Sequence, residues 1–317
     1  MKRKRRRMVP FVAIGLVILA GIWILIQGIT LQDALRKAEA RLTSYGAQAV
    51  ALPQGQISYV DKGEGPVILV SHGISGGFDQ AYDAVKGKEN KYRLLAPSRF
   101  GYPGSLMPEN ASVKAQATAF AQLLDALDIE QAYVLGTSAG GTPAIRFALD
   151  YPERCKGLIL YSSAMPETSP PQTFSTWQGP PAFTLNDFVM WTFRGLFSPL
   201  MGMEPDTVNG MLPLYLRTDG IRLDAQVTNP DMAKNFIDYP IEEIACPVLI
   251  IGAKDDKLVD ASAMEQAAPR FQNHQLLLFE SGGHLMQGHG HEVEAALDQF
   301  ILDIEQTVNM DIEQTVN

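Results

Sequence analysis

The chain has 317 residues, of which 46% are hydrophobic and 19% are charged, so it carries enough apolar side chains for a packed core. Its net charge is −9, although six of its 26 Lys and Arg residues lie within the first seven positions, which leaves the remainder strongly acidic. Nucleic-acid binding requires a basic surface, so an acidic body of this kind excludes a nucleic acid as the expected partner.

The N-terminus combines a basic tail with a long apolar run. Lys2–Arg7 are all basic, and the uncharged stretch from Met8 to Gln27 is long enough to cross a bilayer as a helix. A signal peptide has a shorter apolar region that ends in a small-x-small cleavage site, which this run lacks. We therefore predict a cytoplasmic basic tail and transmembrane anchor over residues 1–29. The anchor makes membrane lipid a partner and places the body on the extracytoplasmic side, periplasmic or outer.

The body alternates between strand-like and helix-like segments. Apolar residues at helical spacing predict a stalk helix over residues 30–46, and two short alternating stretches around Pro53 predict a hairpin. Further strands are expected at residues 67–70, 92–96, 132–135, 158–162, 248–252 and 275–279, and helices at residues 78–89, 112–128 and 141–151. Strands that alternate with helices predict an α/β fold with a mostly parallel sheet.

Two segments interrupt this alternation. Residues 164–239 are rich in proline, methionine and aromatic residues and predict a helical cap insertion between two sheet strands, which divides the core into residues 47–163 and 240–302. Such a cap predicts an apolar, adaptable pocket wall. The tail, residues 303–317, contains the sequence DIEQTVN twice, and its second copy, Asp311–Asn317, is expected to be a frayed extension without a catalytic role.

The two cysteines, Cys155 and Cys246, form no metal motif and are too few for a disulfide framework. Each lies just before an expected strand, and the two strands could be neighbours in a parallel sheet. We interpret the cysteines as buried thiols that could pair in an oxidising compartment.

The pentapeptide Gly136-Thr137-Ser138-Ala139-Gly140 lies between an expected strand and an expected helix. A G-x-S-x-G sequence in this context is typical of a nucleophile elbow, in which small neighbours allow a sharp turn that exposes the serine hydroxyl. We predict that Ser138 is a nucleophile.

A serine nucleophile needs a base, and histidine is the usual one. Among the five histidines, His284 follows the strand at residues 275–279 and is preceded by two glycines that let its loop fold back over the sheet edge. His284 is the predicted base. A metal site that combines it with His289 and His291 is disfavoured, because this spacing matches no metal motif.

The third member of a triad should follow a strand and precede the histidine. Asp255 and Asp256 both meet these conditions, Asp260 is a further choice, and the chemistry of the residues alone leaves the choice open.

Two backbone N–H groups are needed to hold the oxyanion. One is expected from Ala139, directly after the nucleophile, and the other from Ile74 in the Gly-rich loop that follows Ser71-His72-Gly73.

Taken together, these motifs resemble those of the α/β-hydrolase superfamily over roughly residues 47–302. The resemblance rests on His72-Gly73, the elbow, Gly282-Gly283-His284 and two further segments, Ser98–Ser105 and Cys246–Ile250. The family's acid loop often reads D-x-x-V-P, which Asp256-Lys257-Leu258-Val259-Asp260 fits with Asp in place of proline, so the resemblance favours Asp256. In the segment Ser98–Ser105 the chain departs from the family pattern D-x-x-G-x-G-x-S, because Ser98 replaces the aspartate.

The resemblance implies a serine hydrolase of the carboxylesterase or lipase kind, which acts on a small ester without a metal or an organic cofactor, and the composition of the cap favours an apolar ester. A carbon–carbon-bond hydrolase or another acyl-transfer enzyme is the alternative within the superfamily. A ligand receptor or pseudoenzyme that retains the triad is the alternative outside catalysis.

Overall fold

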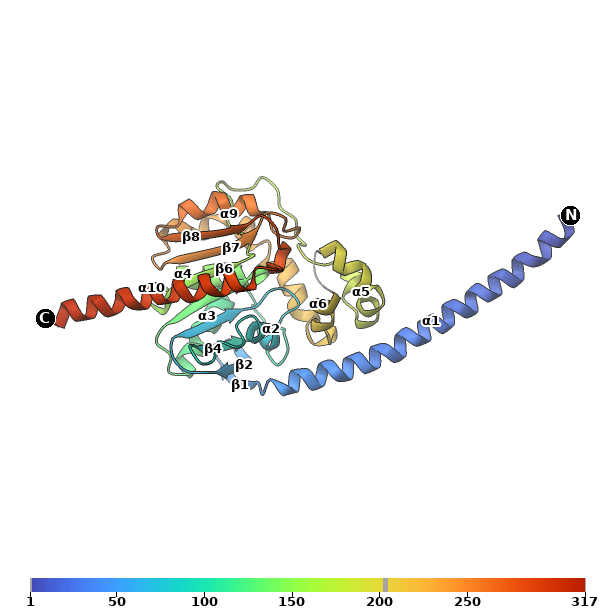
Figure 1. The fold of residues 1–317 in the computed structure, drawn as a ribbon, viewed down its shortest axis with the longest axis horizontal. Coiled ribbons are helices and arrows are strands. Elements are labelled where there is room, and N and C mark those ends of the chain that lie inside the picture. The colour runs from blue at the N-terminus through green and yellow to red at the C-terminus, as the bar shows by residue number, and fades with distance from the viewer. Residues whose placement is uncertain (1, 202–204, 317) are drawn as a thin grey trace.

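The computed structural model describes residues 2–201 and 205–316, and its centre is an eight-stranded sheet (Figure 1). The strand order is β1-β2-β4-β3-β5-β6-β7-β8, with β1 and β2 antiparallel to their neighbours and every later pair parallel. The strands are β1 (Gln48–Leu52), β2 (Gly55–Lys62), β3 (Val67–Ser71), β4 (Arg93–Pro97), β5 (Ala132–Thr137), β6 (Cys155–Tyr161), β7 (Val248–Ala253) and β8 (His274–Phe279). The mostly parallel sheet expected from the sequence is confirmed.

Helices cover both faces of this sheet, which explains why its central strands are apolar throughout. One buried cluster lies between the sheet and α3 (Val113–Ala126), α4 (Gly141–Asp150) and α9 (Ala261–Ala267). A second cluster lies on the opposite face, beneath α2 (Phe78–Asp83) and α10 (Gly290–Val316). The carboxyl ends of β3, β5, β6, β7 and β8 therefore meet at one edge, from which the loops that carry the predicted site emerge.

Between β6 and β7 the chain leaves the sheet and forms an insertion of short helices. These are α5 (Asp187–Met201), α6 (Pro205–Gly210), α7 (Thr218–Leu223) and α8 (Asp231–Lys234), together with several single helical turns. Figure 1 places α5 and α6 beside α1 (Lys2–Ser44), at the side of the domain toward the N-terminus, and α5 packs against α1.

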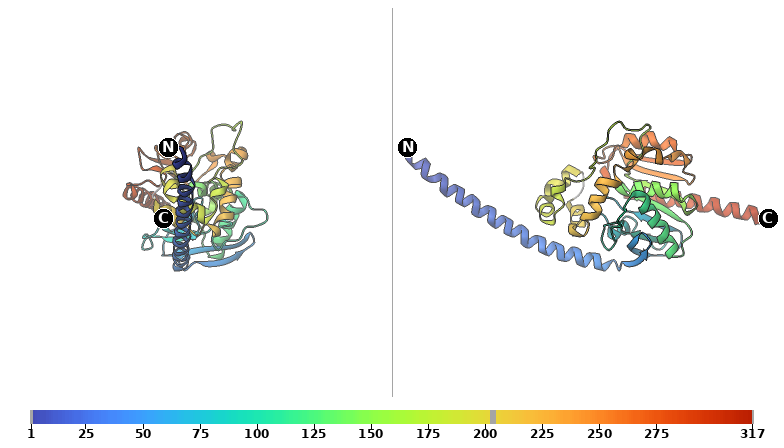
Figure 2. Two further views of the ribbon diagram at one scale, coloured as in Figure 1. Left: turned by 90° about the vertical axis from the view of Figure 1, so that its right-hand side faces the viewer. Right: turned by 180° about the vertical axis from the view of Figure 1, so that it is seen from behind.

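The predicted anchor and stalk form one continuous helix, α1, because no proline interrupts the chain between Pro10 and Pro53. From Ala13 onward α1 contains an apolar window with a mean hydropathy of 2.3, long and apolar enough to cross a membrane by length and composition. Its last turns pack on the domain through Leu31, Ala38 and Leu42, which are all buried. The rest of α1 projects away from the domain, opposite to the C-terminal end of α10 (Figure 2).

Two helices differ in length from the sequence expectation. α2 ends at Asp83, because the chain turns near Gly87, where φ is +91°. α10 runs through both copies of the repeated tail sequence, where a frayed extension was expected. No glycine or proline follows Gly290, so nothing in the sequence stops this helix.

Cys155 is the first residue of β6 and Cys246 lies two positions before β7, and these strands are parallel neighbours in the sheet. Their Sγ atoms are 3.6 Å apart and both are free thiols. Contact with Cys246 and burial together raise the pKa of the Cys155 thiol well above its usual value. Cys155 is therefore an unreactive, protonated core residue in this structure.

Candidate active site

The predicted nucleophile sits at a strained turn between β5 and α4. β5 ends at Thr137, the single helical turn η1 spans Ser138–Gly140, and α4 begins at Gly141. Ser138 has a φ of +52°, a left-handed conformation that residues other than glycine rarely adopt. Strain of this kind is characteristic of functional turns, and here it leaves the serine half-buried at the sheet edge.

The glycines of the pentapeptide are required by close packing on either side of this turn. A Cβ atom at Gly136 would lie 2.7 Å from the Cβ atom of Ala144 on α4. A Cβ atom at Gly140 would lie 2.0 Å from the carbonyl oxygen of Ser71, at the end of β3. The turn is therefore pressed against the neighbouring strand.

The predicted base and one of the predicted acids are hydrogen-bonded to each other. Nδ1 of His284 lies 2.8 Å from Oδ2 of Asp256, and both side chains are buried. The other carboxylate oxygen of Asp256 accepts hydrogen bonds from the backbone N–H groups of Leu258 and Val259. Burial opposes ionisation of Asp256, but the contact with His284 and the two N–H groups outweigh it and lower its pKa below the usual value.

The adjacent carboxylate, Asp255, has a different environment. It is exposed and accepts hydrogen bonds from the backbone N–H groups of Gly282 and Gly283, at 3.3 and 2.8 Å. Asp255 thus ties the His284 loop to the loop after β7 without contacting the imidazole. Asp260, the third choice, instead caps the N-terminus of α9 through Ser262.

The His284 loop is also held from the β6 side. The Ser162 hydroxyl, directly after β6, donates a 2.6 Å hydrogen bond to the carbonyl oxygen of His284. β6 is paired with β5, with Tyr161 opposite Thr137, so this bond brings the loop back toward the strand that carries Ser138. Gly282 and Gly283 have φ values of +132° and +60°, which explains why this reversal uses two glycines.

The loop after β3, residues 72–77, lies against the elbow. A Cβ atom at Gly73 would lie 3.3 Å from the Cβ atom of Ser138. The Gly73 carbonyl faces His72 and Gly76, since it accepts hydrogen bonds from Nδ1 of His72 at 2.8 Å and from the N–H of Gly76 at 3.2 Å. The N–H of Ile74 belongs to the same planar trans peptide and therefore points in the opposite direction.

His72 stabilises this loop as a neutral imidazole. Its Nε2 atom accepts a hydrogen bond from the N–H of Arg99 at 2.9 Å, so its proton is on Nδ1, which faces the Gly73 carbonyl. Burial, followed by the positive charge of Arg99, holds the pKa of His72 well below its usual value.

The remaining histidines near His284 have other surroundings. His289 stacks on the ring of Phe279, with ring centroids 4.1 Å apart, and its Nδ1 lies 3.5 Å from Glu292. Within residues 2–201 and 205–316, no three His, Cys, Asp or Glu side chains are grouped closely enough to share a metal ion.

Sequence reasoning missed two buried ion pairs that connect the insertion with the loop at residues 72–77. Arg99 binds Asp224 of the insertion through both carboxylate oxygens, at 2.5 and 2.6 Å, and also donates to the carbonyl oxygen of Gly73. Arg217 of the insertion binds Asp79 at 2.7 and 3.1 Å, and neither side chain is exposed. The partners in each pair lie more than 120 positions apart, so no local pattern in the sequence indicates the pairing. The one local signal is the position of Arg99 within the family-like segment Ser98–Ser105.

The departure at Ser98 does not loosen this region. The Ser98 hydroxyl accepts a hydrogen bond from the N–H of Phe78 at 2.8 Å, and its carbonyl oxygen accepts one from the Ser105 hydroxyl at 2.8 Å. Ser98, at the position where the family pattern has an aspartate, therefore ties the loop to Phe78 of α2 and joins its two ends through Ser105.

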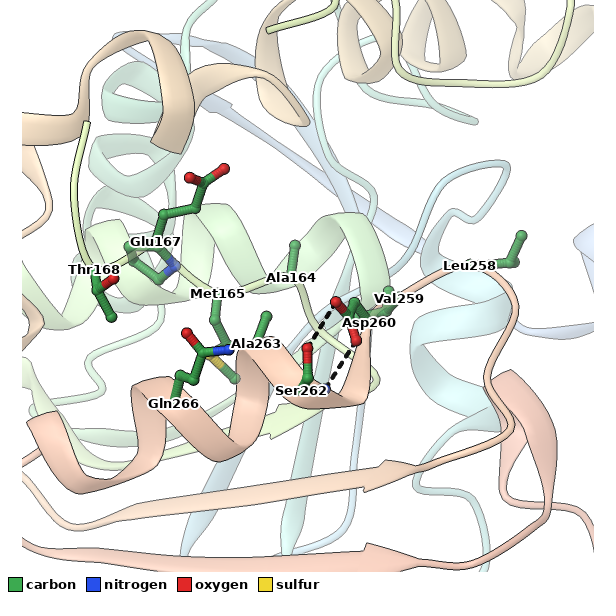
Figure 3. Close-up of a pocket in the computed structure, with 11 residues that line it drawn as sticks. Ala164, Met165, Glu167, Thr168, Leu258, Val259, Asp260, Ser262, Ala263 and Gln266 are labelled. Carbon is green, nitrogen blue, oxygen red and sulfur yellow. Dashed lines mark hydrogen bonds between the residues drawn. The ribbon is translucent and has the colours of Figure 1, made fainter. Parts of the chain in front are cut away.

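A pocket of about 440 Å³ lies beside the acid loop (Figure 3). Its walls come from the start of the insertion and the beginning of α9, and the lining residues are Ala164, Met165, Pro166, Glu167, Thr168, Leu258, Val259, Asp260, Ser262, Ala263 and Gln266. Among the lining residues that the structure describes, Met165 is the one methionine and none is aromatic, whereas the composition of the insertion predicts an apolar, adaptable wall rich in both. Leu258 and Val259 connect it with Asp256, because their N–H groups bind that carboxylate.

The packing at the elbow predicts a steric effect of Gly140→Ala. The added methyl group would meet the carbonyl oxygens of Ser71 and His72 at 2.0 and 2.4 Å, and backbone atoms cannot rotate away. We expect a loss of about 3 kcal/mol in the free energy of unfolding, measured as a lower Tm. Gly195→Ala on α5 is the control, since its Cβ atom meets nothing within 4 Å. Equal melting temperatures for the two variants would contradict this packing.

The state of His72 predicts a pH-dependent stability. Because its folded pKa lies below its unfolded value of about 6.5, the unfolded chain takes up a proton that the folded chain does not. This contribution is complete above the unfolded pKa and is lost as the pH falls. Between pH 7.5 and 5.5, we expect the free energy of unfolding of the wild type to fall by about 1.4 kcal/mol more than that of His72→Gln, as measured by urea unfolding. Parallel curves for the two proteins would be the opposing result.

Comparison with known proteins agrees with this architecture. Residues 66–290 match the alpha/beta hydrolase fold family. The chain is 27% identical over 266 residues to the uncharacterized hydrolase YcgS of Bacillus subtilis, which covers 75% of this chain and 92% of that protein. It is 26% identical over 255 residues to a 2-hydroxy-6-oxo-6-phenylhexa-2,4-dienoate hydrolase of Burkholderia cepacia, with coverage of 72% and 84%.

Among solved structures, a bacterial membrane phospholipase A has the same fold, with a TM-score of 0.63, 19% identity, and coverage of 95% of this chain and 99% of that one. Other proteins with this fold include esterases, lipases and meta-cleavage product hydrolases. The match over residues 66–290 shows that the chain belongs to the α/β-hydrolase fold family.

Proposed function

We propose that this protein is a serine hydrolase that cleaves a carboxylic ester through an acyl-enzyme. Ser138 is the nucleophile, His284 the general base and Asp256 the residue that orients it. The observation that carries this proposal is the 2.8 Å hydrogen bond between Nδ1 of His284 and the buried carboxylate of Asp256, at the same sheet edge as the strained Ser138 turn. Three residue types in this arrangement suit nucleophilic acyl transfer.

In this mechanism Asp256 fixes the imidazole tautomer. With the proton held on Nδ1, Nε2 of His284 has a free electron pair that takes the proton from the Ser138 hydroxyl as its oxygen attacks the ester carbonyl. The tetrahedral intermediate collapses when His284 returns that proton to the leaving alcohol, which yields an acyl-serine. A water molecule, deprotonated by His284, then attacks the acyl-serine and releases the carboxylic acid, and the proton returns to Ser138.

The oxyanion of each tetrahedral intermediate needs donors that are already in place. We assign this role to the N–H groups of Ala139 and Ile74. Ala139 follows Ser138 in the helical turn before α4, where the first backbone N–H groups have no partner within the helix. The orientation of the Gly73–Ile74 peptide, with its carbonyl tied to His72 and Gly76, supports the second assignment.

The insertion, residues 164–239, is proposed to be a cap over this site. In support, Met190, Leu214 and Ile221 of the insertion form an apolar cluster with Tyr102, against which Ile74 packs. Gly179 also approaches the Ile74 side chain, since its Cβ atom would lie 3.5 Å from Cδ1. A cap in this position would exclude water from the oxyanion donors.

The substrate is proposed to be an apolar acyl ester that reaches the site from a membrane in which α1 is anchored. The indole N–H of Trp191, on α5, donates a 3.0 Å hydrogen bond to the Thr30 hydroxyl, three positions before Asp33, the first charged residue after Arg7. The cap would thus lie next to the bilayer, with Phe193 and Leu196 of α5 exposed there. Apolar side chains at such a surface would favour a lipid-like substrate.

The neighbouring carboxylates of Asp256 and Asp255 allow the same substitution to be compared at two adjacent positions. Asp256→Asn should lower kcat for p-nitrophenyl esters by about 10³-fold or more, because His284 loses the acceptor that fixes its tautomer. Asp255→Asn should lower it less than about tenfold, since it only weakens the tie to Gly282 and Gly283. Ser138→Ala should abolish the burst of acyl-enzyme formation. Equal hydrolysis by wild type and Ser138→Ala, or equal losses at the two aspartates, would overturn the assignment.

A carbon–carbon-bond hydrolase is the second candidate, favoured by the likeness to a dienoate hydrolase and to meta-cleavage product hydrolases. To separate the two activities, kcat/KM is measured for short and long p-nitrophenyl esters and for a meta-cleavage dienoate, and the values are compared. Labelling of Ser138 by a fluorophosphonate without turnover of any substrate would instead favour a receptor that retains the triad.

The proposed topology predicts the position of the C-terminus. If α1 spans the inner membrane with Lys2–Arg7 in the cytoplasm, alkaline phosphatase fused after Asn317 should be active and a fluorescent protein in the same place should not fluoresce. Replacement of the six basic residues by glutamine should weaken this orientation. The reverse pair of reporter signals from the wild-type chain would show that the catalytic domain is cytoplasmic.

A further inference from the structure

The loop that carries Ile74 is held in an unfavourable backbone conformation by side chains from outside it. Ser75 has a φ of +63°, and a Cβ atom at Gly76 would collide with the His72 ring at 2.3 Å. The Ser75 N–H donates to the Tyr102 hydroxyl at 3.2 Å, and the Ser75 carbonyl accepts from Arg217 at 3.3 Å. A loop with these backbone angles requires such external contacts to persist.

Arg217 is connected to the Gly73–Ile74 peptide through the Ser75–Gly76 peptide. Its Nη1 atom donates to the carbonyl oxygens of Ser75 and Gly76. In the planar Ser75–Gly76 peptide, a carbonyl turned toward Arg217 directs the Gly76 N–H the opposite way, where it donates to the Gly73 carbonyl at 3.2 Å. That bond, together with those from His72 and Arg99 to the same carbonyl, holds the Gly73–Ile74 peptide, which carries the proposed oxyanion donor.

Arg217 is oriented by a carboxylate that it shares with the N-terminal helix. Oδ2 of Asp79 accepts hydrogen bonds from Arg217 at 2.7 Å and from Arg41 of α1 at 2.7 Å. Burial opposes ionisation of Asp79, but Arg217 and then Arg41 outweigh it and lower its pKa below the usual value. Asp79 is therefore an anion between two guanidinium groups that come from distant parts of the chain.

Arg41 also fastens the insertion to α1. Its Nη2 atom donates to the carbonyl oxygens of Gly210 and Leu212 at 3.0 and 3.1 Å. Its side chain is 31% exposed, whereas those of Asp79 and Arg217 are fully buried. Arg41 is therefore the solvent-accessible end of the series, and it lies on the same stretch of α1 as the buried Ala38 and Leu42.

We propose that Arg41, Asp79 and Arg217 are positioning residues that couple the seating of α1 on the domain to the orientation of the Ile74 N–H. This inference rests on the proposed ester hydrolysis. When α1 is seated, Arg41 holds Asp79, Asp79 holds Arg217, and Arg217 holds the loop in the form that accepts an oxyanion. When α1 moves away, Asp79 loses one of its two cationic partners and the loop loses part of its support.

The test compares two arginines of α1 in the full-length, detergent-solubilised protein. Arg41→Ala should lower kcat for p-nitrophenyl butyrate about tenfold with KM nearly unchanged, because the oxyanion forms only in the transition state. Arg41→Lys keeps a cation opposite Asp79 and should restore most of kcat. Arg36→Ala is the matched control, since Arg36 is exposed and its ion-pair partner is Asp33 on the same helix. It should behave as wild type.

A second readout separates this inference from the proposed function. Fluorophosphonate labelling of Ser138 places a phosphonyl oxygen among the same donors, so Arg41→Ala should slow labelling about tenfold even if no ester is turned over. Absence of Ser138-dependent ester turnover in the wild type would refute the proposed function but leave this labelling test in place. Labelling and kcat of Arg41→Ala within twofold of Arg36→Ala, a change in KM alone, or no rescue by lysine would each overturn the coupling.

Discussion

The site depends on the close approach of the elbow to the end of β3. Gly140 leaves no space for a side chain against the carbonyl oxygen of Ser71, so the turn that carries Ser138 and the loop that begins at His72 are in direct contact. This contact is a consequence of β3 and β5 being neighbours in the parallel sheet. Because the carboxyl ends of parallel strands share one edge, the turn that carries Ser138 and the loop that carries Ile74 emerge next to each other.

Much of the fold and the pairing of His284 with an aspartate could be predicted because their signals are local. Apolar runs between Gly-rich turns mark the buried strands, and the resemblance of the loop after β7 to the family's acid loop favoured Asp256, the carboxylate that bonds His284. Asp255 and Asp256 have the same side chain, so residue type alone does not distinguish them. Their surroundings separate them, since one carboxylate meets the imidazole and the other meets the N–H groups of Gly282 and Gly283.

The buried ion pairs could not be predicted, because neither partner has a local signal. Arg217 and Asp79 lie 138 positions apart, and each reads in sequence as an ordinary surface charge. The same is true of Asp224, whose partner Arg99 belongs to a different segment of the chain. Continuity of α1 was also missed, because composition divides it into an apolar part and an amphipathic part while its backbone hydrogen bonds do not. Tertiary context, and not propensity, decides such features.

The two ion pairs between the insertion and the core have opposite polarity, and together they fix the position of the insertion. The insertion contributes an aspartate to one pair and an arginine to the other, while the core contributes Arg99 and Asp79. A displaced insertion would separate both pairs and leave Asp79 with Arg41 alone, and every charge that stayed buried without its partner would be strongly destabilising. Apolar packing alone tolerates sliding, whereas charges of alternating sign permit a single arrangement. Arg99 and Arg217 also donate hydrogen bonds to carbonyls of the loop at residues 72–77. The contacts that position the insertion therefore also hold that loop.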